Sequence, residues 1–397
     1  MGSELITPHG NKLTPCLLEG IELENNIKKA ANLPQLSISS KEVSDLIMMA
    51  IGAFSPIEGF MNKKDYNRVV ENMKLKDGTL WPIPITLSIS SKDYQEYKAK
   101  DGIKVGQEIA LTGQESNDII GVIQIEEIFP YDKQKEAKSI FLTTDETHPG
   151  VKKLYEQGDF YIGGKVRVFN CGGYLDLYPE FATCKETRQI FKERGWSTIV
   201  AFQTRNPIHR SHEYLTKTVL ETADGLFIHP IVGKLKEGDI PAEVRMKCYQ
   251  VLLENYYPKD RVLLKVYPME MRYAGPKEAI LHAIIRQNYG CSHIVIGRDH
   301  AGVGDFYGPF EAQEIFDSLS DDDLLIKPVK MDWTFYCEKC GAIASFKTCP
   351  HPDSNHRMIS GTKLREMLSR GEYPPDYITR KEVSDILISY YKSLESK

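Results

Sequence analysis

The sequence predicts an α/β protein whose central layer is a parallel β-sheet covered by helices. Apolar runs of strand length recur between residues 197 and 296, and helical segments separate them. These runs do not alternate between apolar and polar residues, which is typical of strands buried on both faces of a parallel sheet. We therefore expect a Rossmann-like layer with right-handed crossovers, and ligands beyond the carboxyl ends of its strands.

The length of 397 residues exceeds what one hydrophobic core usually supports, so two to three domains are expected. The composition changes near residue 170 and again near residue 327. We place an N-terminal domain at residues 1–170, a central domain at 171–327 and a C-terminal domain at 328–397.

The N-terminal domain reads as short β segments broken by Gly, Pro and Asp, with one early helix near residues 44–51. The β segments are residues 81–87, 107–111 and 119–128. Prolines in the first of them place it at a sheet edge or a barrel rim. We expect a mixed, mostly β-barrel-like domain, and its sequence shows no catalytic motif.

The central domain supplies the strands and helices of the predicted parallel sheet. The expected strands are residues 197–202, 226–229, 262–266 and 293–296, and the expected helices are residues 211–221, 242–253 and 277–287. A further helix is expected at residues 380–393.

The overall charge excludes several classes of partner. Lys and Arg total 50 against 55 Asp and Glu, so no global positive field exists to bind nucleic acid or an anionic membrane. No apolar run approaches the roughly 20 residues that span a bilayer, and the N-terminus lacks the charged-then-apolar order of a signal peptide. We expect a cytoplasmic protein that binds neither nucleic acid nor membranes.

The first polar segment at a strand end is Gln203–Glu213. Asn206 is a good N-cap and Pro207 a good first helical residue, so we expect a helix to begin there. The free N–H groups and the dipole of such a helix form an anion site. His209 and His212 are three residues apart and would project from one face of its first turns.

Arg205 precedes this helix, and a second polar segment, Gly297–Gly304, follows the strand ending at residue 296. Its glycines allow a close approach to a ligand, and Arg298 and His300 add hydrogen-bond donors. The segment lacks the G-x-G-x-x-G spacing, and the chain has no G-x-x-x-x-G-K-[ST], which disfavours a P-loop kinase or ATPase. Together the two segments suit phosphate or sulfate.

Other interpretations of these histidines stay open. A His pair at this spacing is often a surface or capping pair, and it can bind zinc. Three arginines, Arg205, Arg210 and Arg298, would repel a cation and attract an anion, so an anion site is favoured. We expect His282 to be structural, because its segment is apolar, and His229 could serve either role.

Cysteines cluster near the C-terminus as Cys337, Cys340 and Cys349, followed by His351 and His356. Three cysteines and one histidine make a closed tetrahedral zinc site with no position left for catalysis. The C-x-H separation of His351 is tight, so we favour His356 as the fourth ligand. Eight cysteines in so long a chain are not a disulfide scaffold, and the clustering of three of them suits a reducing compartment with one metal site.

Both polar segments resemble the sequence signatures of the ATP sulfurylase (sulfate adenylyltransferase) family. Residues 271–279 and 52–61 are similar to further parts of that family, so the resemblance covers nearly the whole chain. It implies a PUA-like N-terminal β-barrel domain, a Rossmann-like nucleotidyltransferase domain and a small C-terminal α/β domain, which contains structural zinc in a subset of members. The implied type has a single function and no fused adenylylsulfate kinase.

The implied reaction, a step of sulfate assimilation, joins ATP and sulfate to give adenosine 5′-phosphosulfate and pyrophosphate. Mg²⁺ would arrive with ATP, and the implied assembly is a homodimer. The resemblance places sulfate against Gln203, Arg205 and the backbone N–H of Ala301. It assigns catalysis to Thr204, Arg205, Asn206, His209 and His212. It assigns ATP binding to these five residues together with Gln203, Gly297, Arg298, Asp299 and His300.

Residues 359–365 resemble a phosphate-binding segment of related nucleotidyltransferases. They also read as a helix start capped by Ser360 or Thr362, which is the interpretation we favour.

Two other functions are disfavoured by the sequence. A nucleotidyltransferase with another acceptor, such as a class I aminoacyl-tRNA synthetase, is disfavoured because H-x-x-H lacks the central Gly of H-x-G-H and no K-M-S-K-S follows. An RNA-binding protein built from a PUA-like domain and a zinc knuckle would need a basic stripe, which is not found.

Overall fold

The computed structural model describes residues 4–99, 103–233, 239–358 and 361–395. The predicted cap at Ser360 lies outside these ranges, and the helix expected there, α13, begins at Gly361. No helix in the described ranges combines the length and the apolar character needed to cross a membrane.

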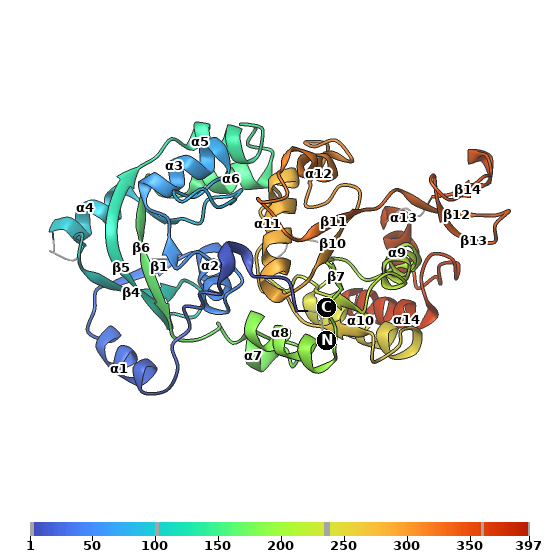
Figure 1. Cartoon of the computed structure of the whole chain (residues 1–397), viewed down its shortest axis with the longest axis horizontal. Helices are drawn as coiled ribbons and strands as arrows, with labels where there is room; N and C mark the ends of the chain where they lie inside the picture. The colour runs from blue at the N-terminus through green and yellow to red at the C-terminus, as the bar shows by residue number, and fades with distance from the viewer. Residues whose placement is uncertain (1–3, 100–102, 234–238, 359–360, 396–397) are drawn as a thin grey trace.

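The N-terminal part is a mixed sheet with helices around it (Figure 1). Its strand order is β1-β4-β5-β6-β2, and β3 also pairs with β6. The strands are β1 (Gln35–Ile38), β2 (Gly59–Phe60), β3 (Leu87–Ile89), β4 (Glu108–Gly113), β5 (Ile119–Pro130) and β6 (Phe160–Val168). The helices are α1 (Gly20–Ala30), α2 (Ser40–Ala50), α3 (Lys63–Asn72), α4 (Ser91–Ala99), α5 (Lys133–Ile140) and α6 (Pro149–Glu156), with a 3₁₀ turn at His9–Asn11.

This sheet departs from the expected barrel in one respect. The strand order of the described residues ends at β1 and β2, so backbone hydrogen bonds do not close a ring. In the proline-rich run at residues 81–87 only its last residue, Leu87, lies in a strand, because proline cannot donate to a ladder. The edge position predicted for this run agrees with β3, which pairs with β6 alone.

The central part is a five-stranded parallel sheet in the order β11-β10-β7-β8-β9. The strands are β7 (Ile199–Phe202), β8 (Gly225–Ile228), β9 (Val262–Leu264), β10 (His293–Ile296) and β11 (Lys327–Lys330). The helices are α7 (Tyr174–Leu177), α8 (Cys184–Glu193), α9 (Arg210–Leu220), α10 (Ala242–Tyr256), α11 (Gly275–Tyr289) and α12 (Glu311–Glu314), followed by a 3₁₀ turn at Ile315–Ser318. This is the expected Rossmann-like layer.

Helix α11 lies between the N-terminal domain and the central sheet (Figure 1). Apart from Lys277, all of its residues are buried, including the charged Glu278 and Arg286. A helix that is buried all round has packing partners on every side. The central and N-terminal domains therefore share one hydrophobic core.

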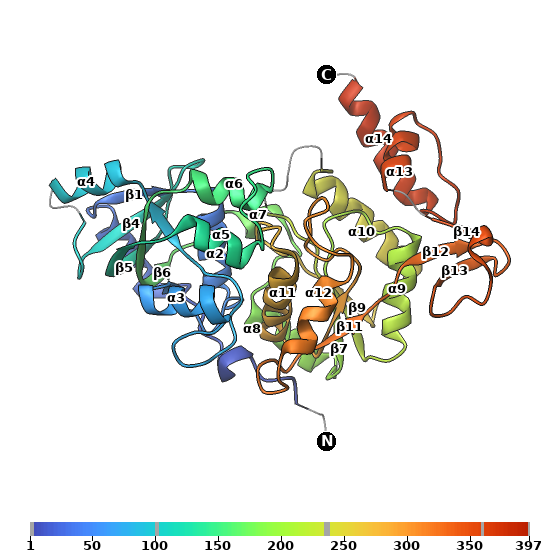
Figure 2. The same ribbon diagram turned by 90° about the horizontal axis from the view of Figure 1, so that it is seen from above.

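The C-terminal part holds a three-stranded antiparallel sheet and two helices at the end of the molecule away from the N-terminal domain (Figure 2). Its elements are β12 (Thr334–Cys337), β13 (Ala342–Ser345), β14 (His356–Arg357), α13 (Gly361–Ser369) and α14 (Lys381–Glu395), with a 3₁₀ turn at Asp353–Asn355. Helix α14 packs beside α10 of the central domain. Strand β11 of the central sheet runs to Lys330, past the boundary placed at residue 327.

Candidate active site

One cavity of about 180 Å³ lies between the two loops that follow β7 and β10. Both strands belong to the parallel sheet, so their carboxyl ends meet at one edge. Arg205 from the first loop and Asp299 and His300 from the second line this cavity. The structure therefore brings together the two segments that the sequence singled out.

Three buried polar atoms of the first loop make no hydrogen bond with any residue in the described part of the chain. They are Oε1 of Gln203, Nη1 of Arg205 and Nδ1 of His209. The Gln203 amide nitrogen has only a weak contact, 3.9 Å from the sulfur of Met271. Because buried polar groups are nearly always paired, the unpaired Nη1 of Arg205, which lines the cavity, indicates a polar ligand there. Gln203 precedes Arg205 in the same loop but does not line the cavity.

The Arg205 guanidinium stacks on an aromatic ring. Its Cζ lies 5.4 Å from the centroid of Tyr273, in the loop before α11. Such a contact orients the guanidinium plane and leaves its edge donors free for an oxyanion. Tyr273 itself is buried.

Thr204 and Asn206 shape the loop. The Thr204 hydroxyl accepts from the Asn206 N–H at 3.1 Å and lies 2.8 Å from the Asn206 carbonyl oxygen, to which it donates. The hydroxyl of Tyr249 donates to the same carbonyl at 2.8 Å. Neither Thr204 nor Asn206 lines the cavity.

The expected helix start at Asn206 and Pro207 is wrong, because α9 begins at Arg210 with His209 as its N-cap. A start at Asn206 would need its carbonyl to accept the N–H of Arg210. Thr204 and Tyr249 already occupy that carbonyl, and the Arg210 N–H donates instead to the carbonyl of Ile378 at 3.0 Å. Tertiary contacts therefore shift the start by three residues.

His209 and His212 face each other, with ring centroids 5.6 Å apart and planes inclined by 25°. The His209 N–H lies 3.3 Å from Nδ1 of His212, to which it donates. Desolvation lowers the pKa of His212 to about 4, and desolvation together with His212 lowers the pKa of His209 to about 3. Both rings are neutral at pH 7, and Nδ1 of His212 is an acceptor. Its Nε2 therefore carries the hydrogen and can donate to a phosphate oxygen.

The second loop contains two non-glycine residues in the left-handed region, Asp299 at φ 52° and Ala301 at φ 57°. Arg298 stacks on Trp333, with Cζ 4.1 Å from the ring centroid, and its Nε contacts Asp299. His300 packs inward, with Nε2 3.0 Å from Nδ1 of His282.

His282 is fully buried, and its Nε2 lies 3.5 Å from a carboxylate oxygen of Glu278. His282 is therefore structural, as expected, and its contact with His300 supports the position of that residue in the site. His229 is also fully buried, and its Nε2 lies 3.0 Å from the Val266 carbonyl oxygen, which makes it structural.

Of the three arginines expected to attract an anion, two are already engaged. Arg298 contacts Asp299, and Arg210 contacts Glu213 through Nη1 at 3.0 Å. Arg205 is the arginine that lines the cavity.

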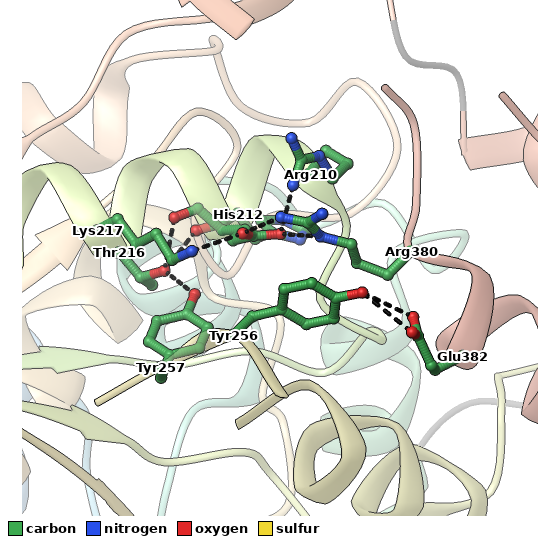
Figure 3. Close-up of polar contacts among 9 residues, drawn as sticks. Arg210, His212, Thr216, Lys217, Tyr256, Tyr257, Arg380 and Glu382 are labelled. Atoms are coloured by element: carbon green, nitrogen blue, oxygen red, sulfur yellow. Dashed lines mark hydrogen bonds and ion pairs between the residues drawn. The ribbon is translucent and has the colours of Figure 1, made fainter. Parts of the chain in front are cut away.

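An ion pair between Glu213 and Arg380 joins the start of α9 to the C-terminal part of the chain, and Figure 3 shows Arg380 extending toward this helix. Arg380 donates through Nη2 and Nε at 2.7 and 3.0 Å, and Lys217 donates at 2.8 Å. The Arg380 guanidinium stacks on Tyr256 at 3.8 Å, and the Tyr256 hydroxyl lies 2.9 Å from Glu382, to which it donates. Residues distant in sequence therefore hold the first turns of α9, the helix that carries His212, through these contacts.

Several site residues were missed by the sequence reasoning. Gly275, Pro276 and Tyr307 line the cavity. The first two lie in the segment 271–279, which carried a family resemblance without an assigned role. Tyr307 follows the glycines of the second loop, and extending that glycine-rich segment to Gly308 would have included it.

The cysteine cluster forms as expected, with one change. The sulfurs of Cys337, Cys340 and Cys349 and Nδ1 of His351 lie within 4.8 Å of one another. Nδ1 of His351 is 3.5 Å from the Cys337 sulfur and 3.3 Å from the Cys340 sulfur. This donor set fits a tetrahedral metal ion.

The four donor atoms that lie within 4.8 Å of one another include His351, the alternative ligand, in place of the favoured His356. His356 lies in β14, where its ring stacks on Phe335 at 3.7 Å, and its Nδ1 contacts Asp353 at 3.3 Å. Its Nε2 lies 3.5 Å from the sulfur of Cys349. His351 follows Cys349 in a loop, which allows both side chains to turn toward one centre.

Comparison with known proteins identifies the family. A model of the ATP-sulfurylase family matches residues 180–390, and a model of the PUA-like domain matches residues 6–171. The chain is 51% identical to a sulfate adenylyltransferase of Psychrobacter sp. (strain PRwf-1), over 99% of this chain and 93% of that protein. It is 52% identical to a sulfate adenylyltransferase of Desulforamulus reducens, over 98% of this chain and 99% of that protein.

Among solved structures, a hexameric APS kinase from Thiobacillus denitrificans is similar, with a TM-score of 0.74 at 22% identity, over 96% of this chain and 68% of that chain. This likeness shows the fold alone. The family model and the full-length relatives confirm the resemblance noted in the sequence, including the PUA-like N-terminal domain, and the chain belongs to the ATP sulfurylase family.

Proposed function

We propose that this protein is a sulfate adenylyltransferase that transfers the adenylyl group of MgATP to sulfate, giving adenosine 5′-phosphosulfate and pyrophosphate. Family membership supports this proposal, and the observation that carries it is the unpaired Nη1 of Arg205 beside the cavity between the two loops. A guanidinium binds a tetrahedral oxyanion through parallel donors and keeps its charge at every physiological pH.

Sulfate is fully ionised at neutral pH, so its attacking oxygen needs no general base. The barrier comes from bringing the sulfate dianion close to the α-phosphorus of ATP, which is itself a polyanion. Catalysis then depends on in-line alignment and on donors placed where charge develops. Arg205, Gln203 and the backbone N–H of Ala301 would hold sulfate, with Thr204 and Asn206 keeping the first loop in shape.

The two histidines would act on the leaving group. Nε2–H of His212 can donate to oxygens that gain charge as pyrophosphate leaves, and His209 lies beside it at the start of α9. Because both are neutral, they act as hydrogen-bond donors rather than as fixed charges. The segment Gly297–His300 would contact the nucleotide. Mg²⁺ would enter as part of MgATP.

The Cys₃His cluster would hold zinc through Cys337, Cys340, Cys349 and His351. Bound zinc would supply a structural cross-link between β12, the turn after it and the loop at residues 349–351. No catalytic step passes through this site. Metal analysis of the purified protein is expected to find one zinc per chain.

A panel of acceptors tests the activity. Pyrophosphate release from MgATP is expected with sulfate, with molybdate acting as a competing oxyanion. Amino acids should give no release. Release with an amino acid and none with sulfate would instead indicate the alternative nucleotidyltransferase. The homodimer and the cytoplasmic location stay predictions, and light scattering on the purified chain would measure the oligomeric state.

A further inference from the structure

The loop that carries Tyr273 has an unusual backbone. Tyr273 has φ 60°, and Gly275, the first residue of α11, has φ 49°, so both lie in the left-handed region. That region is disfavoured for a residue with a side chain, and it persists only where the surroundings fix it. The ring of this same Tyr273 lies against the Arg205 guanidinium. The placement of Arg205 therefore depends on what holds this backbone.

Local contacts hold the backbone on either side of Tyr273. The buried carboxylate of Glu278 accepts the N–H of Arg272 at 2.9 Å and the N–H of Ala274 at 3.0 Å. The Arg272 side chain forms a buried ion pair with Asp45 of α2, in the PUA-like domain. These contacts leave the carbonyl group of Tyr273 to be fixed by another partner.

That partner is His148, which also comes from the PUA-like domain. His148 is fully buried at the N-cap of α6. Its Nδ1 accepts the backbone N–H groups of Gly150 at 3.0 Å and Val151 at 3.3 Å. A ring nitrogen that accepts carries no hydrogen, so the imidazole is neutral and its hydrogen is on Nε2. Nε2 lies 3.0 Å from the Tyr273 carbonyl oxygen and donates to it.

The same imidazole touches a further cavity residue. Nε2 of His148 lies 3.2 Å from the hydroxyl of Tyr307, which donates to the carbonyl of Phe141 at 3.0 Å. The ring of Tyr307 packs against Gly275 so closely that a Cβ at that position would come within 2.7 Å of it. One side chain of the PUA-like domain therefore contacts both Tyr307, which lines the cavity, and the carbonyl of Tyr273, whose ring lies against Arg205.

We infer that His148 is a positioning residue for the oxyanion site. Through the Tyr273 carbonyl it sets the aromatic face on which Arg205 lies, so the PUA-like domain takes part in sulfate binding without contacting sulfate. This inference rests on the proposed role of Arg205. It gives a function to a domain whose sequence shows no catalytic motif.

Two substitutions separate the two hydrogen-bonding roles of the imidazole. His148→Asn keeps an oxygen that can accept the N–H groups at the start of α6, because Asn is a good N-cap, but its shorter side chain cannot reach Tyr273. His148→Gln can place an amide N–H near the position of Nε2 and gives up the cap. His9→Asn is a matched control, since His9 is also a buried histidine of the N-terminal domain, and its Nε2 bonds the carbonyl of Leu80 at 2.7 Å instead of that of Tyr273.

Steady-state kinetics with each substrate and thermal unfolding are measured for all variants. His148→Asn should raise KM for sulfate by about 10- to 100-fold, because a small misplacement of a binding group costs that much, and KM for ATP should stay within about twofold. His148→Gln should keep KM for sulfate closer to that of the wild type and lower Tm. His9→Asn should lower Tm without changing the ratio of the two KM values.

The inference is overturned if folded His148→Asn has a normal KM for sulfate, if both substitutions raise it equally, or if KM for ATP rises as much. Should His148→Asn fail to fold, Tyr273→Leu and Tyr273→Phe carry the test. Tyr273→Leu removes the aromatic face and should raise KM for sulfate, whereas Tyr273→Phe keeps the aromatic face and should not. Equal KM values for sulfate in these two variants would overturn the inference. A wild-type protein with no sulfate-dependent pyrophosphate release would contradict the proposed function instead.

Discussion

Arg380 donates two hydrogen bonds to the carboxylate of Glu213, the residue that follows His212 on α9. Arg380 lies next to the start of α14, so this contact joins the C-terminal part of the chain to the helix of the H-x-x-H motif. The Arg210 N–H bond to Ile378 adds a second connection at the same place. The first turn of α9 is therefore held from outside the central domain.

Replacing Arg380 should loosen this turn. Arg380→Met removes two charged hydrogen bonds and leaves Glu213 with Arg210 and Lys217, so the free energy of unfolding should fall by about 1.5–3 kcal/mol. We expect kcat to fall about tenfold, because the histidines lose alignment. Urea unfolding and turnover measure the two effects. Lys381→Met is the control, since its partner Asp385 is a surface neighbour. Equal losses of stability and kcat in this control would argue against a role of the Arg380–Glu213 contact in holding α9.

His209 and His212, at the start of α9, should make the protein sensitive to acid. In the unfolded chain they titrate near 6.5, whereas in the folded protein their pKa values are lowered to about 3 and about 4. The unfolded state then binds more protons below pH 6.5, so stability falls as pH drops from 6.5 toward 4 and levels off below the folded values.

His212→Asn should reduce this dependence between pH 6.5 and 4, as measured by urea unfolding at each pH. Asn keeps an acceptor for the His209 N–H and does not titrate. An unchanged slope would show that other groups cause the acid sensitivity. For the same reason, neither histidine should contribute a titration to kcat between pH 6 and 8.

Zinc removal should destabilise the C-terminal part and spare the nucleotide site. Chelation is expected to lower the Tm of this part, because bound metal contributes directly to folding, and ATP affinity of the remaining folded protein should stay largely intact. His351→Ala should lower zinc content, whereas His356→Ala should retain one zinc per chain. The reverse pattern would restore His356 as the ligand.

The central sheet could be predicted closely from the sequence because its strands are apolar on both faces. The run at residues 293–296 is the observed β10, and the run at 197–202 contains β7. Strand β11 was missed, because Lys327 and Lys330 interrupt its apolar character at the sheet edge. Short strands such as β2, with two residues, depend on tertiary pairing and leave little local signal.

The site was predictable where polar residues follow strand ends, as for Arg205 and His300. The start of α9 was not, because tertiary contacts occupy the Asn206 carbonyl. His148 gives no local signal either, since it reads as one histidine in a polar turn. Its role depends on a contact 125 residues away in sequence, with Tyr273. The choice between His351 and His356 likewise depends on loop geometry that spacing alone does not fix.

The measurement closest to the central claim is sulfate-dependent pyrophosphate release by Arg205 variants. We predict that Arg205→Ala lowers kcat/KM for sulfate by roughly 10³-fold or more and that Arg205→Lys recovers little, because a single ammonium cannot reproduce two parallel donors. Arg194→Lys is the matched control, as Arg194 also stacks on an aromatic ring, Trp196, outside the cavity. Near-normal turnover of Arg205→Lys would contradict the account.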